Sequence, residues 1–346
     1  MSIPRTTLLF VFLAAILWIR PATTHFPKGP SALESLSEAT AGLASDALMA
    51  TVFLRVDQKE GSAGNGEQHG AGTGFVLDAM RGLVVTNNHV VGDSSSRMRV
   101  TLHDGRQFYG DPVATDPQTD IAVVRIPEGV ARRQLRWGSS DKMVPGSWVM
   151  ALGNPLGLTG TTSLGVVSGL NRELGLAKDS YEDFLQHDAF IDHGSSGGPL
   201  LNMRGEVVGV NTAIGGSLQR DAWQGISYAV PSRMARRVVA DLIEHGKVRR
   251  GWLGVATSDL DFGDARNQGM EVPGGAIVTK LVEDSPAAVA GMKKGDIVLE
   301  LDSMRIRSAA HLRARVGTVA PGSEAIFKIR RGRSTLEMVA LIRERG

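Results

Sequence analysis

Two series of short β-favouring segments, separated by Gly, Asp and Pro residues, occupy residues 72–230 and restrict the folds open to this chain. The first series comprises residues 74–77, 83–86, 97–102, 107–113 and 121–126. The second comprises residues 148–152, 161–170, 184–187, 199–202, 207–213 and 225–230. Short strands with turn residues between them are typical of small antiparallel barrels. We therefore predict two β-barrels, followed by one long helix over residues 232–245 that begins after Pro231 and ends at Gly246.

A glycine-rich turn precedes one of these predicted strands and presents a hydroxyl group. Residues 194–199 read Gly-Ser-Ser-Gly-Gly-Pro, and glycine permits φ > 0 and a close approach of substrate to the backbone. Ser196 is the candidate nucleophile, and the backbone amides of Gly194 and Ser196 could together bind a developing oxyanion. The same segment could also be a glycine-rich hairpin without chemistry.

Two further residues complete a candidate catalytic set. His89 stands near the end of an apolar run over residues 83–91, the kind of rigid element that a general base needs, although core histidines occur in such runs too. Asp120 precedes the β-rich run 121–126, where partial burial would let it orient an imidazole.

Asp104, Asp111 and Asp116 are alternatives to Asp120, because an isolated Asp is often only a turn residue. The chain order His89, Asp120, Ser196 is that of the chymotrypsin-type triad and differs from the orders of the α/β-hydrolases and the subtilisins.

Composition agrees with a globular enzyme and excludes several kinds of site. A chain of 346 residues with 42% apolar content can form two or three cores. The formal net charge of +2 gives no reason to expect a nucleic-acid partner. The sequence has no cysteine, which excludes disulfides, cysteine nucleophiles and cysteine-based zinc sites. We predict no metal and no cofactor.

An apolar run over residues 7–19 lies between Arg5 and Arg20 and indicates export. The run is nearer in length to the apolar part of a signal peptide than to a full membrane span of about 20 residues. No clean Ala-x-Ala site follows, and Trp18 could anchor at the membrane interface. We predict that residues 1–20 are an uncleaved signal anchor, with a cleaved signal peptide as the alternative, and that residues 21–45 are a flexible tether.

The C-terminal part of the chain differs from the rest. Residues 247–250 are predicted to be a short hinge whose charges are solvated. A compact unit follows from Gly251, with characteristic segments at residues 251–255, 275–278, 284–292 and 294–299 and a helix-like segment at 308–317.

Several of these motifs together resemble the HtrA (DegP/DegS) family of serine endopeptidases. They are residues 86–91 (Thr-Asn-Asn-His-Val-Val), 119–123 (Thr-Asp-Ile-Ala-Val) and 194–202 (Gly-Ser-Ser-Gly-Gly-Pro-Leu-Leu-Asn), with residues 151–157 and 210–214. The resemblance runs from about residue 46 to the C-terminus. It implies a mostly β chain with a chymotrypsin-like double-barrel protease domain over residues 46–246 and one PDZ domain, an α+β unit, over residues 251–346.

The resemblance also implies roles for individual residues. His89 would be the base, Asp120 its orienting acid and Ser196 the nucleophile, with the amides of Gly194 and Ser196 as the oxyanion hole. The family usually has Asn-Pro-Gly-Asn-Ser where this chain has Asp-His-Gly-Ser-Ser at residues 192–196. That departure leaves the geometry of the oxyanion loop open. Ile226 and Thr212 are candidate walls of the substrate pocket, and Ile226 would favour small aliphatic residues.

In a PDZ domain, the C-terminus of a peptide adds a strand to a sheet edge while backbone amides hold its carboxylate. By motif match, the carboxylate-binding loop is Trp252, Leu253, Gly254 and Val255, unless the domain is only a spacer. Arg172 stands where DegS-like proteins carry a loop arginine that reports peptide binding, or it is simply a surface residue.

The resemblance further implies a setting and partners. A single PDZ domain matches the anchored DegS type, which implies a homotrimer on the inner membrane with its catalytic domain in the periplasm, or a soluble periplasmic protein if the N-terminal segment is cleaved. The expected function is cleavage of unfolded or regulatory proteins in envelope quality control or stress signalling, gated by peptides with hydrophobic C-termini. The alternatives are a proteolytically silent, chaperone-like binder of unfolded clients and a pure PDZ scaffold.

Overall fold

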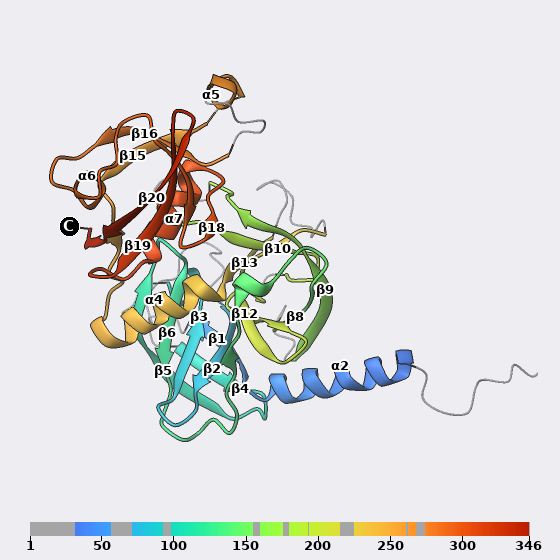
Figure 1. Ribbon diagram of the computed structural model, residues 1–346. Coiled ribbons are helices and arrows are strands. Elements are labelled where there is room, and N and C mark those ends of the chain that lie inside the picture. The colour runs from blue at the N-terminus through green and yellow to red at the C-terminus, as the bar shows by residue number, and fades with distance from the viewer. Residues whose placement is uncertain are drawn as a thin grey trace, which may run out of the picture. The chain divides into compact units, whose positions relative to one another are not determined.

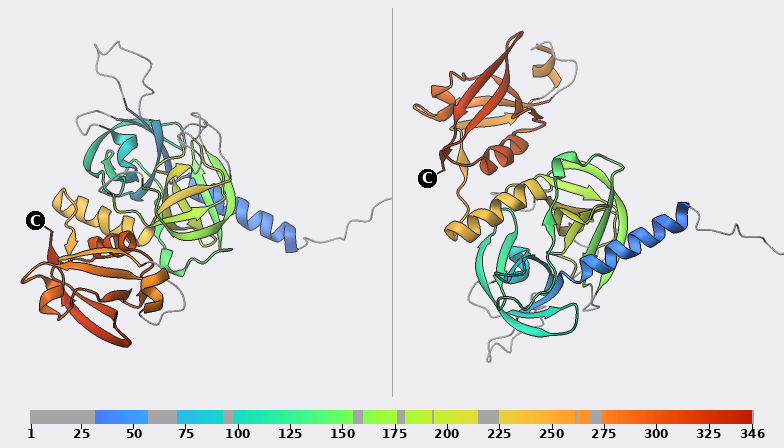
Figure 2. Two further views of the ribbon diagram at one scale, coloured as in Figure 1. Left: turned by 90° about the horizontal axis from the view of Figure 1, so that it is seen from above. Right: turned by 60° about the horizontal axis from the view of Figure 1, so that its bottom comes forward.

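The first series of segments forms a closed antiparallel barrel. The computed structural model describes residues 32–56, 71–92, 98–154, 160–175, 180–192, 194–214, 225–260, 262–267 and 274–345. The strand order of the first barrel is β1-β2-β3-β6-β5-β4, and β4 pairs back onto β1 (Figures 1 and 2). Its strands are β1 (Thr51–Val56), β2 (Ala71–Asp78), β3 (Leu83–Thr86), β4 (Met98–Leu102), β5 (Gln107–Asp116) and β6 (Ile121–Arg125). Aliphatic side chains, among them Leu54, Val84 and Val100, fill its interior.

The second series forms a second barrel. Its strands are β8 (Trp148–Gly153), β9 (Thr161–Arg172), β10 (Phe184–His187), β11 (Pro199–Asn202), β12 (Glu206–Ile214) and β13 (Ser227–Pro231). They follow the order β11-β8-β9-β10-β13-β12, and a further pairing of β11 with β12 closes the barrel. The short strand β7 (Arg136–Trp137) adds to β12 in parallel, and a 3₁₀ turn, η1 (Ser140–Lys142), follows it. The prediction of two antiparallel barrels is confirmed.

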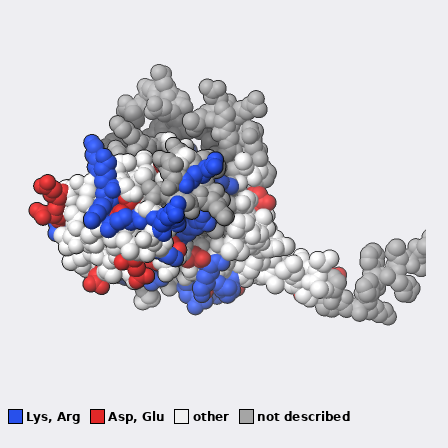
Figure 3. Space-filling model, turned by 45° about the horizontal axis from the view of Figure 1, so that its top comes forward, with Lys and Arg blue, Asp and Glu red and all other residues white. Residues whose placement is uncertain are grey.

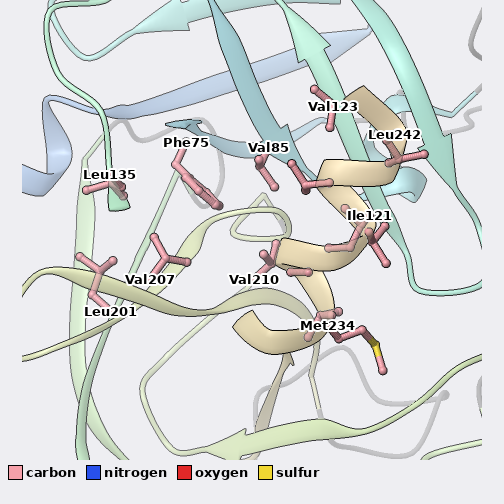
Figure 4. Close-up of a cluster of buried hydrophobic side chains, with 14 of the residues drawn as sticks. Phe75, Val85, Ile121, Val123, Leu135, Leu201, Val207, Val210, Met234 and Leu242 are labelled. Atoms are coloured by element: carbon pink, nitrogen blue, oxygen red, sulfur yellow. The ribbon is translucent and has the colours of Figure 1, made fainter. Parts of the chain in front are cut away.

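Helix α4 (Ser232–His245) packs across both barrels, and its bounds are those predicted (Figure 2). Apolar side chains recur along one face of the helix, as core packing requires. In Figure 4, Met234 and Leu242 of α4 lie beside Ile121 and Val123 of β6, with Val210 of β12 in the same buried cluster. The helix therefore joins the start of β6 to β12, the strands that flank the candidate site.

Gly246 ends α4. Its φ is 68°, in the left-handed region, and its N–H donates to the carbonyl of Leu242 at 3.1 Å. Glycine adopts this conformation without the steric cost that other residues incur, so it is a common helix terminator.

The C-terminal residues form a separate sheet with its own core. The sheet order is β15-β16-β17-β19-β20, with β18 on β17 and with β14 paired to β21. The strands are β14 (Gly251–Trp252), β15 (Val255–Asp259), β16 (Ala276–Leu281), β17 (Ile297–Leu301), β18 (Met304–Arg305), β19 (Glu324–Arg331), β20 (Ser334–Leu341) and β21 (Arg343–Glu344). The helices are α5 (Phe262–Asn267), α6 (Pro286–Val289) and α7 (Ala309–Thr318). Val298, Leu312 and Phe327 are at the centre of the core, and β15 lies at an edge of the sheet.

The predicted flexible tether over residues 21–45 is wrong for residues 32–45, which belong to helix α2 (Ala32–Leu48). Ala, Leu and Glu are good helix formers, and Leu43, Ala44 and Leu48 pack against the buried cluster of the barrels. Residues 21–31 and the apolar run 7–19 lie outside the described residues. No helix in the described part of the chain is both long and apolar enough to cross a bilayer.

The predicted solvation of residues 247–250 is wrong for Arg250, which is only 7% exposed. Its guanidinium group forms an ion pair with Asp116 and lies 4.5 Å from the centre of the Tyr181 ring. A planar guanidinium group can pair with a carboxylate and stack on an aromatic ring at once, so this arginine is accommodated in the interior.

Candidate active site

His89 and Asp120 form a hydrogen-bonded pair. His89 lies on α3 (Asn88–Val91), a single helical turn that follows β3 directly. Its Nδ1 is 2.8 Å from Asp120 Oδ2, and its backbone N–H donates to Asp120 Oδ1 at 3.0 Å. The carboxylate therefore contacts both the ring and the backbone of His89. The imidazole is held through Nδ1, which leaves Nε2 for proton transfer, and the side chain of His89 is half-exposed.

The backbone around Asp120 fixes the direction of its carboxylate. Asp120 has φ 57°, a left-handed conformation that Asp tolerates better than most residues. Its carbonyl accepts hydrogen bonds from the Asn88 N–H at 3.2 Å and from Asn87 Nδ2 at 2.7 Å. Thr212 Oγ1, on β12, donates to Asp120 Oδ2. The acid is thus held by residues of both barrels.

The three other candidate aspartates have different surroundings. Asp104 binds Arg106 at 2.8 Å, and this hydrogen bond lowers the pKa of the Asp104 carboxyl. Asp116 is buried and binds Thr119 and Arg250, and Asp111 is exposed on β5. Of the four aspartates, all of which the structure describes, Asp120 alone pairs with His89.

Ser196 follows a turn whose geometry the sequence left open. The N–H of Ser195 donates to the carbonyl of Asp192 at 2.8 Å, and Gly194, the third residue of this turn, has φ 92°. A positive φ at the third position of a turn favours glycine, which adopts it without steric cost. The carbonyl of Ser196 accepts the N–H of Thr73 on β2 at 2.8 Å. His193 lies outside the described residues.

The backbone amides around Ser196 differ in their hydrogen-bond partners. The N–H of Gly197 donates to the carbonyl of Asn211 at 2.8 Å, whereas those of Gly194 and Ser196 donate to no residue that the structure describes. A Cβ at position 197 would lie 2.2 Å from the carbonyl oxygen of Thr73, so only glycine fits there. Two free amides beside a half-buried hydroxyl suit the binding of an oxyanion.

Ser196 and His89 are not hydrogen-bonded to each other in this structure. Hydrogen bonds between catalytic groups are often long without substrate and tighten when it binds, so their geometry in the free protein does not exclude the pair. The two residues come from different barrels, β3–α3 for His89 and the turn before β11 for Ser196.

A groove of about 460 Å³ lies beside the predicted carboxylate-binding loop. Residues of the loop, of β15 and of α7 form its walls, including Leu253, Leu312 and Val316. The carbonyls of Leu253 and Gly254 accept the N–H groups of Ala287 and Val282 at 3.0 and 2.9 Å, while the amides of both loop residues donate to no described residue. An open strand edge next to free amides suits an extended peptide that ends in a carboxylate.

Both halves of the chain match known protein families. Residues 72–210 match the trypsin-like peptidase domain, and residues 251–341 match the PDZ domain. Among solved structures, the HtrA-type protease AlgW with decapeptide is 31% identical, with a TM-score of 0.64 over 88% of this chain and 98% of AlgW. The chain belongs to the HtrA family of serine proteases.

Curated HtrA relatives include two periplasmic proteases of Escherichia coli (strain K12). The periplasmic serine endoprotease DegP is 40% identical over 272 residues, which cover 77% of this chain and 56% of DegP. The periplasmic pH-dependent serine endoprotease DegQ is 38% identical over 273 residues, which cover 78% of this chain and 58% of DegQ. The chain thus spans little more than half the length of these relatives.

The remaining predicted residues of this HtrA chain have mixed surroundings. Thr212, which was assigned to the substrate pocket, directs its hydroxyl to Asp120, a contact that sequence analysis missed. Ile226 is half-buried before β13 and stays a predicted pocket residue, because residues 215–224 next to it lie outside the described residues. Arg172, at the end of β9, is exposed and donates to Gln186 Oε1 at 2.8 Å. Its regulatory role stays a prediction.

Proposed function

We propose that this HtrA chain is a serine endopeptidase that works through an acyl-enzyme. The observation that carries the proposal is the His89–Asp120 pair, together with a turn before Ser196 in which the amides of Gly194 and Ser196 donate to no described residue. A chaperone-like binder would need neither a held imidazole nor two free amides beside a hydroxyl.

In this proposal each group has a step in peptide hydrolysis. Ser196 Oγ attacks the substrate carbonyl as His89 Nε2 takes its proton, while Asp120 stabilises the imidazolium ion. The amides of Gly194 and Ser196 bind the oxyanion of the tetrahedral intermediate. His89 then protonates the departing amine, and water releases the acyl group by the same steps in reverse.

We infer that peptides with hydrophobic C-termini bind the groove and raise the activity. The apolar walls formed by Leu253, Leu312 and Val316 suit a hydrophobic terminal side chain. Tyr181, which lies between β9 and β10 of the second barrel, also lines this groove, and its hydroxyl accepts a hydrogen bond from Arg345 at 2.9 Å. A bound peptide would therefore touch a residue of the barrel that carries Ser196.

The setting that we propose is the bacterial envelope. The curated relatives named above are periplasmic proteases, which supports a periplasmic catalytic domain that acts on unfolded or regulatory proteins. On the family resemblance, residues 1–20 would anchor a DegS-like homotrimer in the inner membrane.

The test of this proposal is cleavage of an unfolded reporter protein by the 346-residue chain, with and without a peptide that ends in a hydrophobic residue. Ser196→Ala measured beside it should lose several orders of magnitude in rate, and the peptide should accelerate the wild-type chain. Equal rates for the two proteins would contradict the assignment of Ser196. A wild-type chain that binds the reporter but never cleaves it would favour the chaperone-like binder.

A further inference from the structure

A residue of the first barrel holds the turn that precedes Ser196 in the second barrel. Thr73, on β2, is fully buried. Its Oγ1 donates to the carbonyl of Gly194 at 2.6 Å, and its backbone N–H donates to the carbonyl of Ser196 at 2.8 Å. One threonine thus binds the carbonyls of Gly194 and Ser196, the two neighbours of Ser195 in the chain. Sequence analysis placed no functional role at this position.

These contacts fix the peptide unit between the two candidate oxyanion donors. The Gly194 carbonyl is bound by Thr73 Oγ1, and the N–H of the same peptide, on Ser195, is bound by the Asp192 carbonyl at 2.8 Å. The plane of this peptide is therefore held at both ends. The amides of Gly194 and Ser196 flank it, so their directions depend on its orientation.

The hydroxyl of Thr73 is itself oriented. It accepts the backbone N–H of Asn154, which directly follows β8, at 2.9 Å, and Asn154 Nδ2 lies 3.4 Å away. A hydroxyl has one proton to donate and can accept two hydrogen bonds. With both acceptor positions facing Asn154 donors, the proton of Thr73 goes to the Gly194 carbonyl.

The strand that carries Thr73 is fixed as well. The carbonyl of Thr73 accepts the hydroxyl of buried Thr86, on β3, at 2.7 Å. The backbone N–H, the carbonyl and the hydroxyl of Thr73 all have partners, and two of these partners belong to the turn beside the nucleophile.

We propose that Thr73 is a positioning residue for the oxyanion hole. Its hydroxyl keeps the Gly194–Ser195 peptide in the orientation that points the amides of Gly194 and Ser196 at the reacting carbonyl. The inference rests on the proposed function, because it requires those amides to bind an oxyanion. Thr73 acts through the loop and does not touch the substrate carbonyl.

Thr73→Val tests the inference, since valine keeps the shape of threonine but cannot donate a hydrogen bond. Removing one oxyanion donor outright costs about 10²–10³ in kcat, so misdirecting two donors should lower kcat by about 10- to 100-fold while KM changes less than about twofold. Thr73→Ser, which keeps the hydroxyl, should retain most of the activity. Each rate is divided by the concentration of active sites titrated with a fluorophosphonate.

A second readout separates positioning from loss of structure. A peptide boronate adds Ser196 Oγ to boron and places an oxygen in the oxyanion site, so its affinity for Thr73→Val should fall in parallel with kcat. The affinity of a non-cleavable peptide should not change. Thr51→Val is the matched control, because Thr51 is a buried threonine on β1 whose hydroxyl binds Ala47 at 3.1 Å.

Three outcomes would overturn the inference. One is a titratable Thr73→Val chain with wild-type kcat, and another is a Thr73→Ser chain impaired as severely as Thr73→Val. If Thr73→Val does not fold, Thr73→Cys takes its place, because a thiol is a weaker hydrogen-bond donor than a hydroxyl. The kcat of Thr73→Cys should be lower than the kcat of the wild type and of Thr73→Ser, but should not fall to zero. A wild-type kcat in Thr73→Cys is the third outcome that contradicts the inference. A wild-type chain that neither cleaves substrate nor reacts with the fluorophosphonate would instead refute the proposed function itself.

Discussion

His187 lies on β10 with its imidazole fully buried in the second barrel. Burial lowers its pKa from 6.5 to about 4, against a smaller opposing effect of the neighbouring Asn211. As the pH falls below about 6.5, the unfolded chain takes up this proton first, so the folded state loses stability until the pH reaches about 4. The loss is complete below that pH and amounts to roughly 3 kcal/mol for one such residue.

We therefore expect His187→Leu to weaken the acid sensitivity of the protein. The free energy of unfolding, measured in urea at pH 7 and pH 4.5, should fall less in the variant than in the wild type. The exposed His103→Leu is the control, because it removes an imidazole from the surface and leaves the barrel interior intact. An unchanged difference between the two pH values in His187→Leu would contradict the burial argument.

The site residues that sequence analysis predicted are those with local signals. Ser196 lies in a glycine-rich turn, His89 ends an apolar run and Asp120 precedes another, so each was visible in a few neighbouring residues. The contacts of Thr73 and Thr212 were not visible in this way. Thr73 binds a residue 121 positions away, and Thr212 binds one 92 positions away. Such pairs depend on how the two barrels meet, which local patterns do not specify.

At the scale of elements, the loop between β14 and β15 depends on one glycine. Gly254 has φ 82°, and a Cβ at this position would lie 2.2 Å from the Cβ of Ser285. Ser285 is buried and caps α6, where its side chain accepts the N–H of Ala288 at 3.2 Å. Any side chain at position 254 would therefore displace either the loop or the start of α6.

We expect Gly254→Ala to abolish peptide binding at the groove and to destabilise the C-terminal core. Gly291→Ala is the matched control, because Gly291 has φ 84° but open space where a Cβ would lie. In the control, the free energy of unfolding should fall only by the cost of a left-handed alanine, about 1–2 kcal/mol. The control should still bind the peptide. Fluorescence anisotropy of a labelled peptide and thermal unfolding measure the two effects; equal behaviour of the two variants would be inconsistent with the predicted clash.

Element positions were largely predictable because the relevant signals repeat along the chain. The bounds of β3, β10, β11 and α4 match the predicted ranges, and Pro231 and Gly246 bracket α4. Helix α2 was missed because the Pro, Thr, Ser, Gly and Ala content of residues 21–45 suggested a flexible tether, whereas the C-terminal leucines of the helix pack on the core. Tertiary packing often outweighs composition in this way.

At the scale of the whole molecule, charge is nearly balanced. The sequence has 38 Lys and Arg residues against 36 Asp and Glu residues. In Figure 3, basic side chains form an irregular band with acidic side chains beside it. The field beyond the Debye length of about 8–10 Å is therefore weak, and we expect selectivity to come from contacts in the active site and the groove.

Tyr181 offers a test of coupling between the groove and the second barrel. Tyr181→Ala removes a ring that lines the groove and its contact with Arg345, so we expect the activating effect of a peptide on kcat/KM to fall several-fold. Tyr109→Ala, at an exposed position of β5, is the control. Activity of Tyr181→Ala that rises with peptide as steeply as that of the wild type would show that coupling does not run through this residue.

The central claim, that Ser196 is a nucleophile activated by His89, is tested most directly by covalent labelling with a fluorophosphonate. The reagent phosphonylates an activated serine with loss of fluoride, and mass spectrometry of the intact and digested chain locates the adduct. The account predicts a single adduct on Ser196 of the native protein. Neither His89→Ala nor a chain denatured before the reagent is added should be labelled. A native chain that stays unlabelled, or carries its label on another serine, would contradict it.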